Sequence, residues 1–250
     1  MKTGFKIIWL DEVDSTNSYV RRHLSSLDNL SVIAAESQTA GRGQRGNKWL
    51  SKAGDNLTFS ILLFPGMNGV PSIPVDRQFI ISEAATIAVA EMLGEYGINA
   101  KIKWPNDIYC GDRKICGMLV ENTLADKNVR ASIVGIGLNV NQTDFPPELM
   151  NPCSMKYLTK RTFDTKACLL RLLEVLSAYI DMASSSPDKL KEKYLSMLYR
   201  KDESRHYTDK IEGRVFKGVI RGVSDDARLM VELEDGCFKY FAFKEISYII

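Results

Sequence analysis

Short apolar and β-branched segments, each bounded by Gly, Asp or Asn, constrain the fold of this chain most. They lie at residues 5–10, 31–36, 56–64, 101–104, 115–122 and 129–140. Runs of this length and composition between turn-forming residues are typical of β-strands. We therefore expect one sizeable sheet in the first part of the chain.

Helical periodicity separates some of these segments. It is clearest at 77–96, where Phe79, Ile80, Ala84 and Ile87 recur mostly at three- and four-residue spacing, and residues 169–180 and 190–198 behave likewise. Residues 14–17, Asp-Ser-Thr-Asn, precede another apolar-periodic segment and resemble a helix N-terminus. The sequence thus predicts helices packed on the sheet.

The composition changes after the polar stretch 200–210. Short alternating runs follow at 214–220, 229–233 and 238–243, with turn residues between them. Tight strands of this kind predict a small barrel of about 45 residues, which would need packing against its neighbour to be stable. A chain of 250 residues can hold one large domain and such an appendage.

Charge and cysteine content exclude several classes of protein. Lys plus Arg number 33 and Asp plus Glu 31, so the net charge of +2 argues against a general nucleic-acid or membrane surface. The apolar run 7–10 is too short for a signal peptide, and no transmembrane stretch occurs. Five cysteines are scattered without C-x-x-C pairs. This favours a reduced, cytoplasmic protein with structural thiols over a zinc or disulfide protein.

A glycine-rich basic loop spans residues 41–46, Gly-Arg-Gly-Gln-Arg-Gly. It matches the dinucleotide pattern G-x-G-x-x-G, but turn residues and then a strand follow where a Rossmann unit needs a helix. The Walker pattern and the other protein-kinase motifs are also missing. Glycine amides and arginine forks suit anions, so the loop is either an anion site or a solvated turn.

A second constellation lies at 103–107, Lys-Trp-Pro-Asn-Asp, followed by a turn and Lys114. The oxygens of Asn106 and Asp107 on a Pro turn would suit Mg²⁺, and Lys114 could supply a fixed positive charge. Taken singly, Asp107 could be a turn former, Lys114 a solvated lysine and Trp104 a core residue.

Together the motifs resemble those of the biotin protein ligase family. The matching segments are residues 14–17, 36–43 continuing to Trp49, 103–107, 113–117 (Arg-Lys-Ile-Cys-Gly) and 135–141 (Gly-Ile-Gly-Leu-Asn-Val-Asn), in the family's order over about half of the chain. The resemblance implies an α+β fold: a mixed-sheet catalytic domain related to class II aminoacyl-tRNA synthetases at 1–205 and an SH3-like barrel at 206–250. Because the first strand begins near Phe5, we expect a short form without an N-terminal DNA-binding domain.

The implied enzyme is an ATP-dependent ligase that converts biotin to biotinyl-AMP, with Mg²⁺, and transfers biotin to a lysine of a carrier protein. The resemblance, together with the positive charges of Arg42 and Lys114, predicts the following site. The catalytic residues are Lys114 and Arg42, and the metal ligands are Asp107 and Asn106. The biotin-binding residues are Ser15, Thr16, Asn17, Gln38, Gly41, Arg42, Gly43, Gln44, Lys114 and Gly117. The residues that bind ATP or the adenylate are Arg42, Gln44, Arg45, Trp49, Lys103, Asn106 and Asn139.

One residue departs from the family pattern. Gln44 stands where relatives often have arginine, and its neutral amide cannot neutralise a phosphate, so retention of the adenylate is in question. The rival interpretations are a lipoate ligase or octanoyltransferase, which needs an apolar tunnel, and a non-catalytic biotin-sensing module. The expected partner is the biotin carboxyl carrier domain of a carboxylase, without DNA or membrane, and a homodimer is possible through a free sheet edge.

Overall fold

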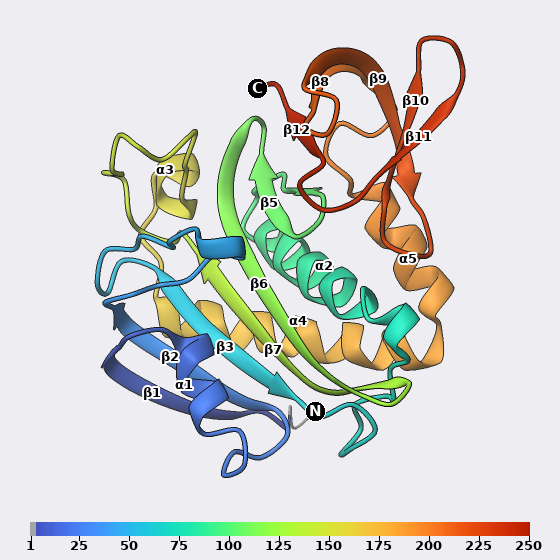
Figure 1. Ribbon diagram of the computed structural model, residues 1–250. Helices are drawn as coiled ribbons and strands as arrows, with labels where there is room; N and C mark the ends of the chain where they lie inside the picture. Colours follow the sequence, from blue (N-terminus) through green and yellow to red (C-terminus); the bar gives the residue numbers. More distant parts are fainter. Residues whose placement is uncertain (1–3) are drawn as a thin grey trace.

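A seven-stranded mixed sheet forms the centre of the molecule (Figure 1). The computed structural model describes residues 4–250, apart from the side chain of Arg45. The strand order is β1-β2-β3-β7-β6-β5-β4; β1 and β2 are parallel, and the other neighbours are antiparallel. The strands are β1 (Lys6–Val13), β2 (Ser31–Gln38), β3 (Leu57–Leu63), β4 (Lys101–Lys103), β5 (Asp107–Cys110), β6 (Arg113–Ala125) and β7 (Asn128–Leu138).

The central strands β3 and β7 are almost wholly buried. Their side chains point alternately to the two faces of the sheet, and the two faces differ in polarity. Along β3, Leu57, Phe59 and Ile61 belong to the large apolar core, whereas Ser60 contacts the first turn of α1 and Leu62 packs with Val20 of that helix. Successive side chains of a strand point to opposite faces. One face of the sheet is therefore free to carry polar groups.

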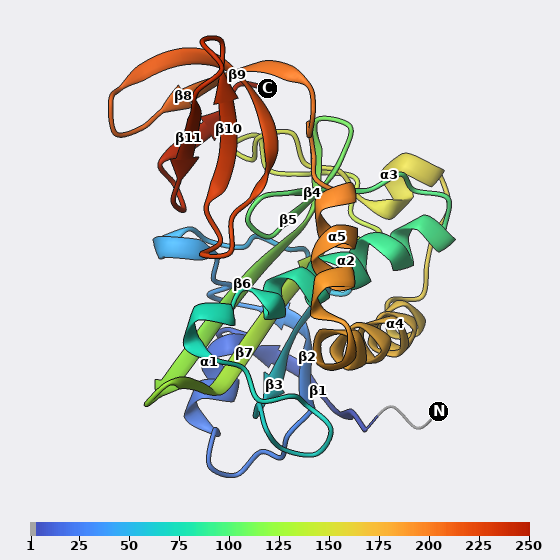
Figure 2. The same cartoon turned by 90° about the vertical axis from the view of Figure 1, so that its right-hand side faces the viewer.

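Helices α2 (Ile80–Glu95), α4 (Thr165–Ser185) and α5 (Pro187–Ser196) cover the apolar face, and α1 (Thr16–Arg22) lies on the other (Figure 2). The first turn of α4 is capped by Asp164, whose carboxylate accepts from two backbone amides. Proline at the start of α5 has no amide to leave unpaired. Short elements complete this part of the chain: η1 (Gln44–Gly46), η2 (Val75–Arg77) and α3 (Met155–Thr159).

The C-terminal part is a separate antiparallel sheet with the order β11-β10-β9-β8-β12. Its strands are β8 (Ser204–Asp209), β9 (Arg214–Val223), β10 (Leu229–Leu233), β11 (Phe238–Phe241) and β12 (Ile246–Tyr248). In the described chain β11 and β12 share no ladder, so the expected barrel is observed as an open sheet. The apolar core continues into it through Tyr207, Ile220, Leu229 and Phe241.

Trp104 joins the two sheets. Its indole Nε1 donates to the Ala227 carbonyl oxygen at 3.1 Å, and its ring lies 5.1 Å from that of Phe243, centroid to centroid. The following peptide bond to Pro105 is cis, and the Pro105 carbonyl accepts from the hydroxyl of Tyr194 on α5 at 3.1 Å. The turn that carries Asn106 and Asp107 is thus held from both sides.

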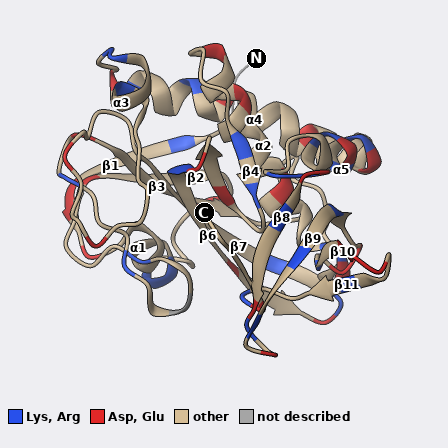
Figure 3. Ribbon diagram, turned by 90° about the horizontal axis from the view of Figure 1, so that it is seen from above, with Lys and Arg blue, Asp and Glu red and all other residues tan. Residues whose placement is uncertain are grey.

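The secondary structure agrees with most of the sequence prediction. Each predicted strand and helix segment is present, with shifted ends, whereas β5, β8, β12 and α3 were not predicted. The division of the chain at residues 205 and 206 stays a prediction; β8 begins at Ser204. Lys and Arg are interspersed with Asp and Glu along the ribbon (Figure 3). Over residues 4–250 no helix has both the length and the apolar composition to cross a membrane.

Candidate active site

A cavity of about 620 Å³ opens on the face of the sheet that carries α1. It is lined by the first turn of α1, the loop 42–50, the centres of β6 and β7, and residues 148–152. Ligand pockets typically have volumes of about 300–1,000 Å³. Most of the predicted site residues, from four distant parts of the sequence, therefore meet around one space large enough for a nucleotide-sized ligand.

Glycines form the floor of the cavity. Gly117 of β6 pairs with Gly137 of β7, and Gly135 follows on the same face. A Cβ atom added to Gly135 would lie 2.2 Å from Asn17 Oδ1, and one added to Gly137 would lie 2.3 Å from the Trp49 ring. Both distances are too short for non-bonded atoms, so only glycine allows Asn17 and Trp49 to lie this close to the sheet.

Polar groups fill one end of the cavity, where α1 begins. Ser15 is the N-cap residue, and its hydroxyl makes no capping hydrogen bond. The backbone amide of Thr16 donates to Gln38 Oε1 at 2.8 Å, and the Thr16 hydroxyl lies 2.7 Å from that of Ser60. Ser15, Thr16 and Ser60 are all buried. A buried group of hydroxyls and amides needs polar partners, which a polar ligand can complete.

Asn17 lies beside these residues, and both the oxygen and the nitrogen of its side-chain amide form hydrogen bonds. Its Oδ1 accepts from the Ser60 hydroxyl at 2.5 Å, and its Nδ2 donates to the Leu119 carbonyl at 3.2 Å and to Glu121 Oε2 at 2.9 Å. Only 3% of the residue is exposed. These contacts fix which end of the amide faces which neighbour.

The glycine loop contributes Arg42, Gly43 and Gln44 to the cavity lining. Arg42 donates through NH2 to Glu121 Oε1 at 3.0 Å, and Gln44 Nε2 donates to Asn106 Oδ1 at 2.9 Å. The side chain of Arg45 lies outside the described part of the chain. Gly41 packs against the backbone of Trp49 instead, where an added Cβ would lie 2.4 Å from the Trp49 carbonyl oxygen.

The indole ring of Trp49 lies over Gly117 and Gly137 on the cavity floor. Its indole nitrogen is buried without a hydrogen-bond partner among the described residues. Asn139, also on the cavity wall, donates from Nδ2 to the Cys153 carbonyl at 3.0 Å, and its Oδ1 is likewise buried without a partner in the described part of the chain. An unpaired donor and an unpaired acceptor at one site are positions that a ligand can satisfy.

Lys114 and Asp107 form an ion pair in the cavity lining. The Lys114 Nζ lies 2.8 Å from Asp107 Oδ1, and the two side chains are 31% and 26% exposed. The Lys114 ammonium also lies 5.9 Å from the centre of the Trp49 ring. Partial exposure keeps this charge available to an anion that enters the cavity.

Lys103, like Gly41 and Asn106, is a predicted site residue that does not line the cavity. Its ammonium lies between the rings of Tyr109 and Tyr248, 4.9 and 4.7 Å from their centres. Burial lowers the pKa of Lys103, although the nearby Asp107 carboxylate opposes this effect. Its ATP-binding role stays a prediction, and its position indicates contact with the C-terminal sheet.

The two predicted metal ligands, Asn106 and Asp107, differ in how far protein partners already occupy their oxygen atoms. Asn106 is buried, with its Oδ1 accepting from Gln44 and its Nδ2 donating to the Met118 carbonyl at 3.0 Å. Asp107 keeps one carboxylate oxygen outside its ion pair with Lys114. The described residues contain no cluster of three or more His, Cys, Asp or Glu that could hold a metal. The donor set fits Mg²⁺ through Asp107 and ligand phosphates, and a role of Asn106 as a metal ligand stays a prediction.

The sequence analysis assigned no role to several residues of this site. Ser60 and Glu121 contact Asn17 directly, and residues 148–150 also line the cavity. The alternating glycines at 135 and 137 within a strand were a usable signal, because glycine in a strand often marks the close approach of another group. The polar Ser60 in the mostly apolar strand β3 was another.

The cavity brings polar, cationic and aromatic side chains together on one face of the sheet. Residues 9–139 match the biotin/lipoate A/B protein ligase family, and the chain belongs to this family. The family resemblance and the α+β fold predicted from the sequence are thereby confirmed.

Some relatives match over nearly the whole chain and others over about half of it. The bifunctional ligase/repressor BirA of Escherichia coli (strain K12) is 29% identical over 254 residues, which cover 98% of this chain and 74% of that protein. The biotin--[acetyl-CoA-carboxylase] ligase of Paracoccus denitrificans is 33% identical over 134 residues, 52% of this chain and 53% of that protein. The structure of the biotin protein ligase from Aquifex aeolicus in complex with biotin and ATP superposes with a TM-score of 0.79, at 29% identity and 97% coverage of each chain.

Proposed function

We propose that this chain is a biotin protein ligase that activates biotin with ATP and transfers it to a lysine of a carrier protein. The observation that carries this proposal is the adjacency, in one cavity, of a buried polar cluster and two cationic side chains, Arg42 and Lys114. A related structure was solved in complex with biotin and ATP, which supports the same ligands here.

The polar cluster would hold the ureido ring of biotin. That ring presents N–H donors and one carbonyl acceptor within a small area. Asn17 Oδ1 can accept from an N–H group, and the Ser15 hydroxyl can donate to the carbonyl. Gln38 Oε1 accepts from the Thr16 amide at 2.8 Å and from its hydroxyl at 3.3 Å, and so holds Thr16 beside the ring. A ligand that satisfies buried polar groups is favoured over one that leaves them unpaired.

Adenylation joins two anions. A carboxylate oxygen of biotin attacks the α-phosphorus of ATP, the new C–O–P linkage forms, and the bond to pyrophosphate breaks. Negative charge accumulates on the α-phosphate in the transition state, so Lys114 and Arg42 contribute by stabilising it. Arg42 is paired with Glu121 without ligands, and its guanidinium must be shared with the incoming anion.

The nucleotide would occupy the end of the cavity near Trp49. The indole and the glycine floor offer a flat surface for adenine, and the unpaired Asn139 Oδ1 can accept from the adenine amino group. Mg²⁺, held by Asp107 and the phosphates, would neutralise charge on the polyphosphate.

Transfer follows when the carrier lysine, as a neutral amine, attacks the carbonyl carbon of biotinyl-AMP. An amide bond forms, AMP leaves with the electron pair of the broken bond, and the amine loses a proton. The name of the Paracoccus denitrificans relative supports a carboxylase carrier domain as partner. The expected homodimer, the absence of DNA and the cytoplasmic location stay predictions.

A lipoate ligase or octanoyltransferase is not favoured, because an aliphatic chain would lie against the buried polar groups of Thr16, Asn17 and Ser60 without using their remaining hydrogen-bonding positions. A non-catalytic sensor has no evident need for the ion pair of Lys114 and Asp107.

Biotin-dependent exchange of labelled pyrophosphate into ATP tests adenylation directly. We expect exchange that requires biotin, ATP and Mg²⁺, and transfer of biotin to a carrier domain when one is added. Folded protein that binds biotin without catalysing exchange would contradict the proposed activity.

A further inference from the structure

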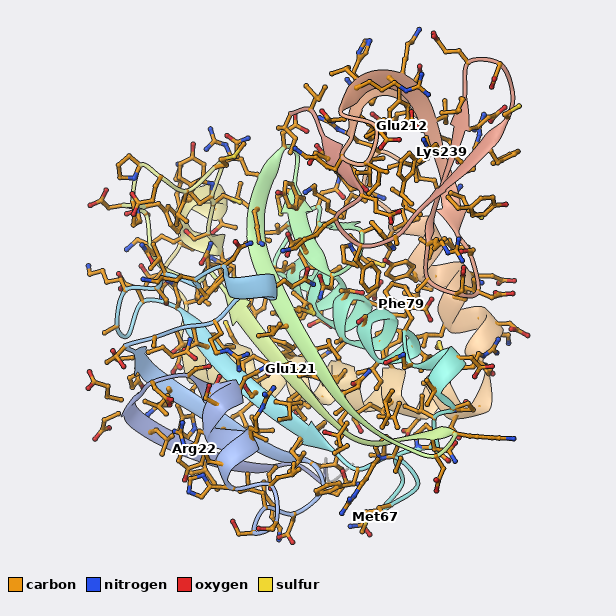
Figure 4. All side chains as sticks on the ribbon, in the orientation of Figure 1. Arg22, Met67, Phe79, Glu121, Glu212 and Lys239 are labelled. Atoms are coloured by element: carbon orange, nitrogen blue, oxygen red, sulfur yellow. The ribbon has the colours of Figure 1, made fainter. Side chains whose placement is uncertain are left out.

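Glu121 of β6 lies where the polar cluster and the glycine loop meet (Figure 4). Its Oε2 accepts from Asn17 Nδ2 at 2.9 Å, and its Oε1 accepts from Arg42 NH2 at 3.0 Å and from Arg21 NH2 at 2.5 Å. The side chain is 18% exposed. One carboxylate therefore contacts both a proposed biotin-binding residue and a proposed phosphate-binding residue.

Glu121 determines which way the Asn17 amide faces. The Leu119 carbonyl and the Glu121 carboxylate can only accept, so both require the NH2 group of Asn17 on their side. Asn17 Oδ1 is then directed toward Ser60 and has one lone pair left. Gly135 lies directly beneath this oxygen, and the amide cannot sink further toward the sheet. The remaining lone pair can accept one N–H of a ligand.

Glu121 also ties the glycine loop to the sheet. Both guanidinium nitrogens of Arg42 approach the carboxylate, NH2 at 3.0 Å and NH1 at 3.4 Å. Within the loop, Gly43 N donates to the Asn47 carbonyl at 2.7 Å and Arg42 forms a β-bridge with Lys48. These local contacts hold the shape of the loop, and the Arg42 side chain connects it with β6.

We propose that Glu121 is a positioning residue that orients Asn17 for biotin and Arg42 for the reacting anions at the same time. The inference rests on the proposed function. It assigns to this carboxylate the alignment of two subsites that lie on different elements, α1 and the glycine loop.

The variant Glu121→Gln should disturb the contact with Asn17 and leave the contact with Arg42 in place. A glutamine amide has one accepting oxygen, and we expect the two arginines on the Oε1 side to occupy it. Its NH2 group then faces the NH2 of Asn17, and the two donors oppose each other. Asn17 must turn over or move, whereas Arg42 keeps a hydrogen-bond acceptor. Glu121→Ala removes both contacts.

Two measurements read the subsites separately: direct calorimetric binding of biotin without ATP, and the KM values for biotin and ATP in pyrophosphate exchange. For Glu121→Gln we expect biotin affinity to fall about tenfold or more, the cost of a buried unsatisfied polar group, and the KM for ATP to change much less. For Glu121→Ala we expect both to worsen. Glu95→Gln is the matched control, because Glu95 also binds an arginine fork, that of Arg171, on the remote surface of α2 and α4.

The proposal is overturned if folded Glu121→Ala binds biotin and uses ATP within about twofold of the unmodified protein, as Glu95→Gln should. It is also overturned if Glu121→Gln raises only the KM for ATP. Calorimetry distinguishes this failure from failure of the proposed function, because the orientation of Asn17 affects biotin binding even in a protein that does not form the adenylate.

Discussion

Lys114 is the residue whose charge the proposed chemistry needs most. It lies on the cavity wall, is paired only with Asp107 among the described residues, and is 31% exposed. We expect Lys114→Ala to lower the rate of biotin-dependent pyrophosphate exchange by about 100-fold or more, because a preorganised charge facing the transition state is lost. The thermal midpoint should change little, since a partly exposed ion pair contributes little to stability. Exchange at a near-normal rate would remove Lys114 from the mechanism.

Gly137 is constrained by the ring above it. In Gly137→Ala the new methyl group would lie 2.3 Å from the Trp49 ring, so the indole must move off the floor. Overpacking of this kind costs about 1–3 kcal/mol of stability. Because the displaced indole is the proposed surface for adenine, we expect the KM for ATP to rise about tenfold. Gly94→Ala on α2 is the control: no atom lies within 4 Å of its added Cβ, and kinetics should not change. Equal ATP kinetics in the two variants would place adenine elsewhere.

Individual residues were predictable where a motif carried them and unpredictable where only the tertiary fold did. Ser15, Asn17, Arg42 and Lys114 line one cavity as their motifs suggested. Ser60 and Glu121 lie outside the motifs, and only the polar Ser60 within a mostly apolar strand gave a sequence signal. Their partners are distant in the chain, and only the sheet register brings them to Asn17.

Helix α2 carries a buried carboxyl group with a raised pKa. Glu83 in its first turn is 7% exposed, and burial raises the pKa of its carboxyl to about 7, against the opposing charges of Lys191 and Arg77. The folded state therefore holds this proton more tightly than the unfolded state, whose pKa is near the ordinary 4.5. The stabilisation is complete below pH 4.5 and is lost as the pH rises toward about 7.

The corresponding prediction is that the free energy of unfolding falls by about 2.5 kcal/mol from this group between pH 5 and pH 8. Urea unfolding at the two values measures it. Glu83→Gln, which cannot ionise, should remove this component and be more stable than the unmodified protein at pH 8. Glu192→Gln, on the exposed side of α5, serves as control and should retain the full pH dependence. A parallel pH response of Glu83→Gln and the unmodified protein would contradict the assignment.

Elements with strong periodicity were predictable, and those defined by their neighbours were not. Helices α2 and α4 and the strands β2, β3 and β7 follow from apolar spacing. Strand β8 lies in a stretch that is polar in sequence, because only Tyr207 and Asp209 of it turn inward. Strand β5 has four residues and exists by pairing with β4 and β6.

At the scale of the molecule, one apolar core spans both sheets, and Trp104 is a principal link between them. Trp104→Ala removes a 4%-exposed indole and its bond to Ala227, and we expect a loss of about 3–5 kcal/mol in the free energy of unfolding. Because the same turn carries Asp107, exchange activity should fall as well. A loss below about 1 kcal/mol in chemical unfolding would mean that the two sheets are joined mainly by other contacts.

The arrangement of the two parts was predictable only in outline. The change of composition after residue 200 indicated a small β-rich appendage. That the appendage remains an open sheet, and that Lys103 turns toward its Tyr248 instead of the cavity, depends on contacts between segments far apart in sequence.

The position of Trp49 should make its fluorescence report on ligand binding in the cavity. The other tryptophans, Trp9 on β1 and Trp104 at the junction of the sheets, lie outside the cavity lining, whereas the Trp49 indole covers the glycine floor. A nucleotide must either stack on this indole or displace it into water, and both events alter its emission. Intrinsic fluorescence of the unlabelled protein should therefore follow the filling of the site in real time.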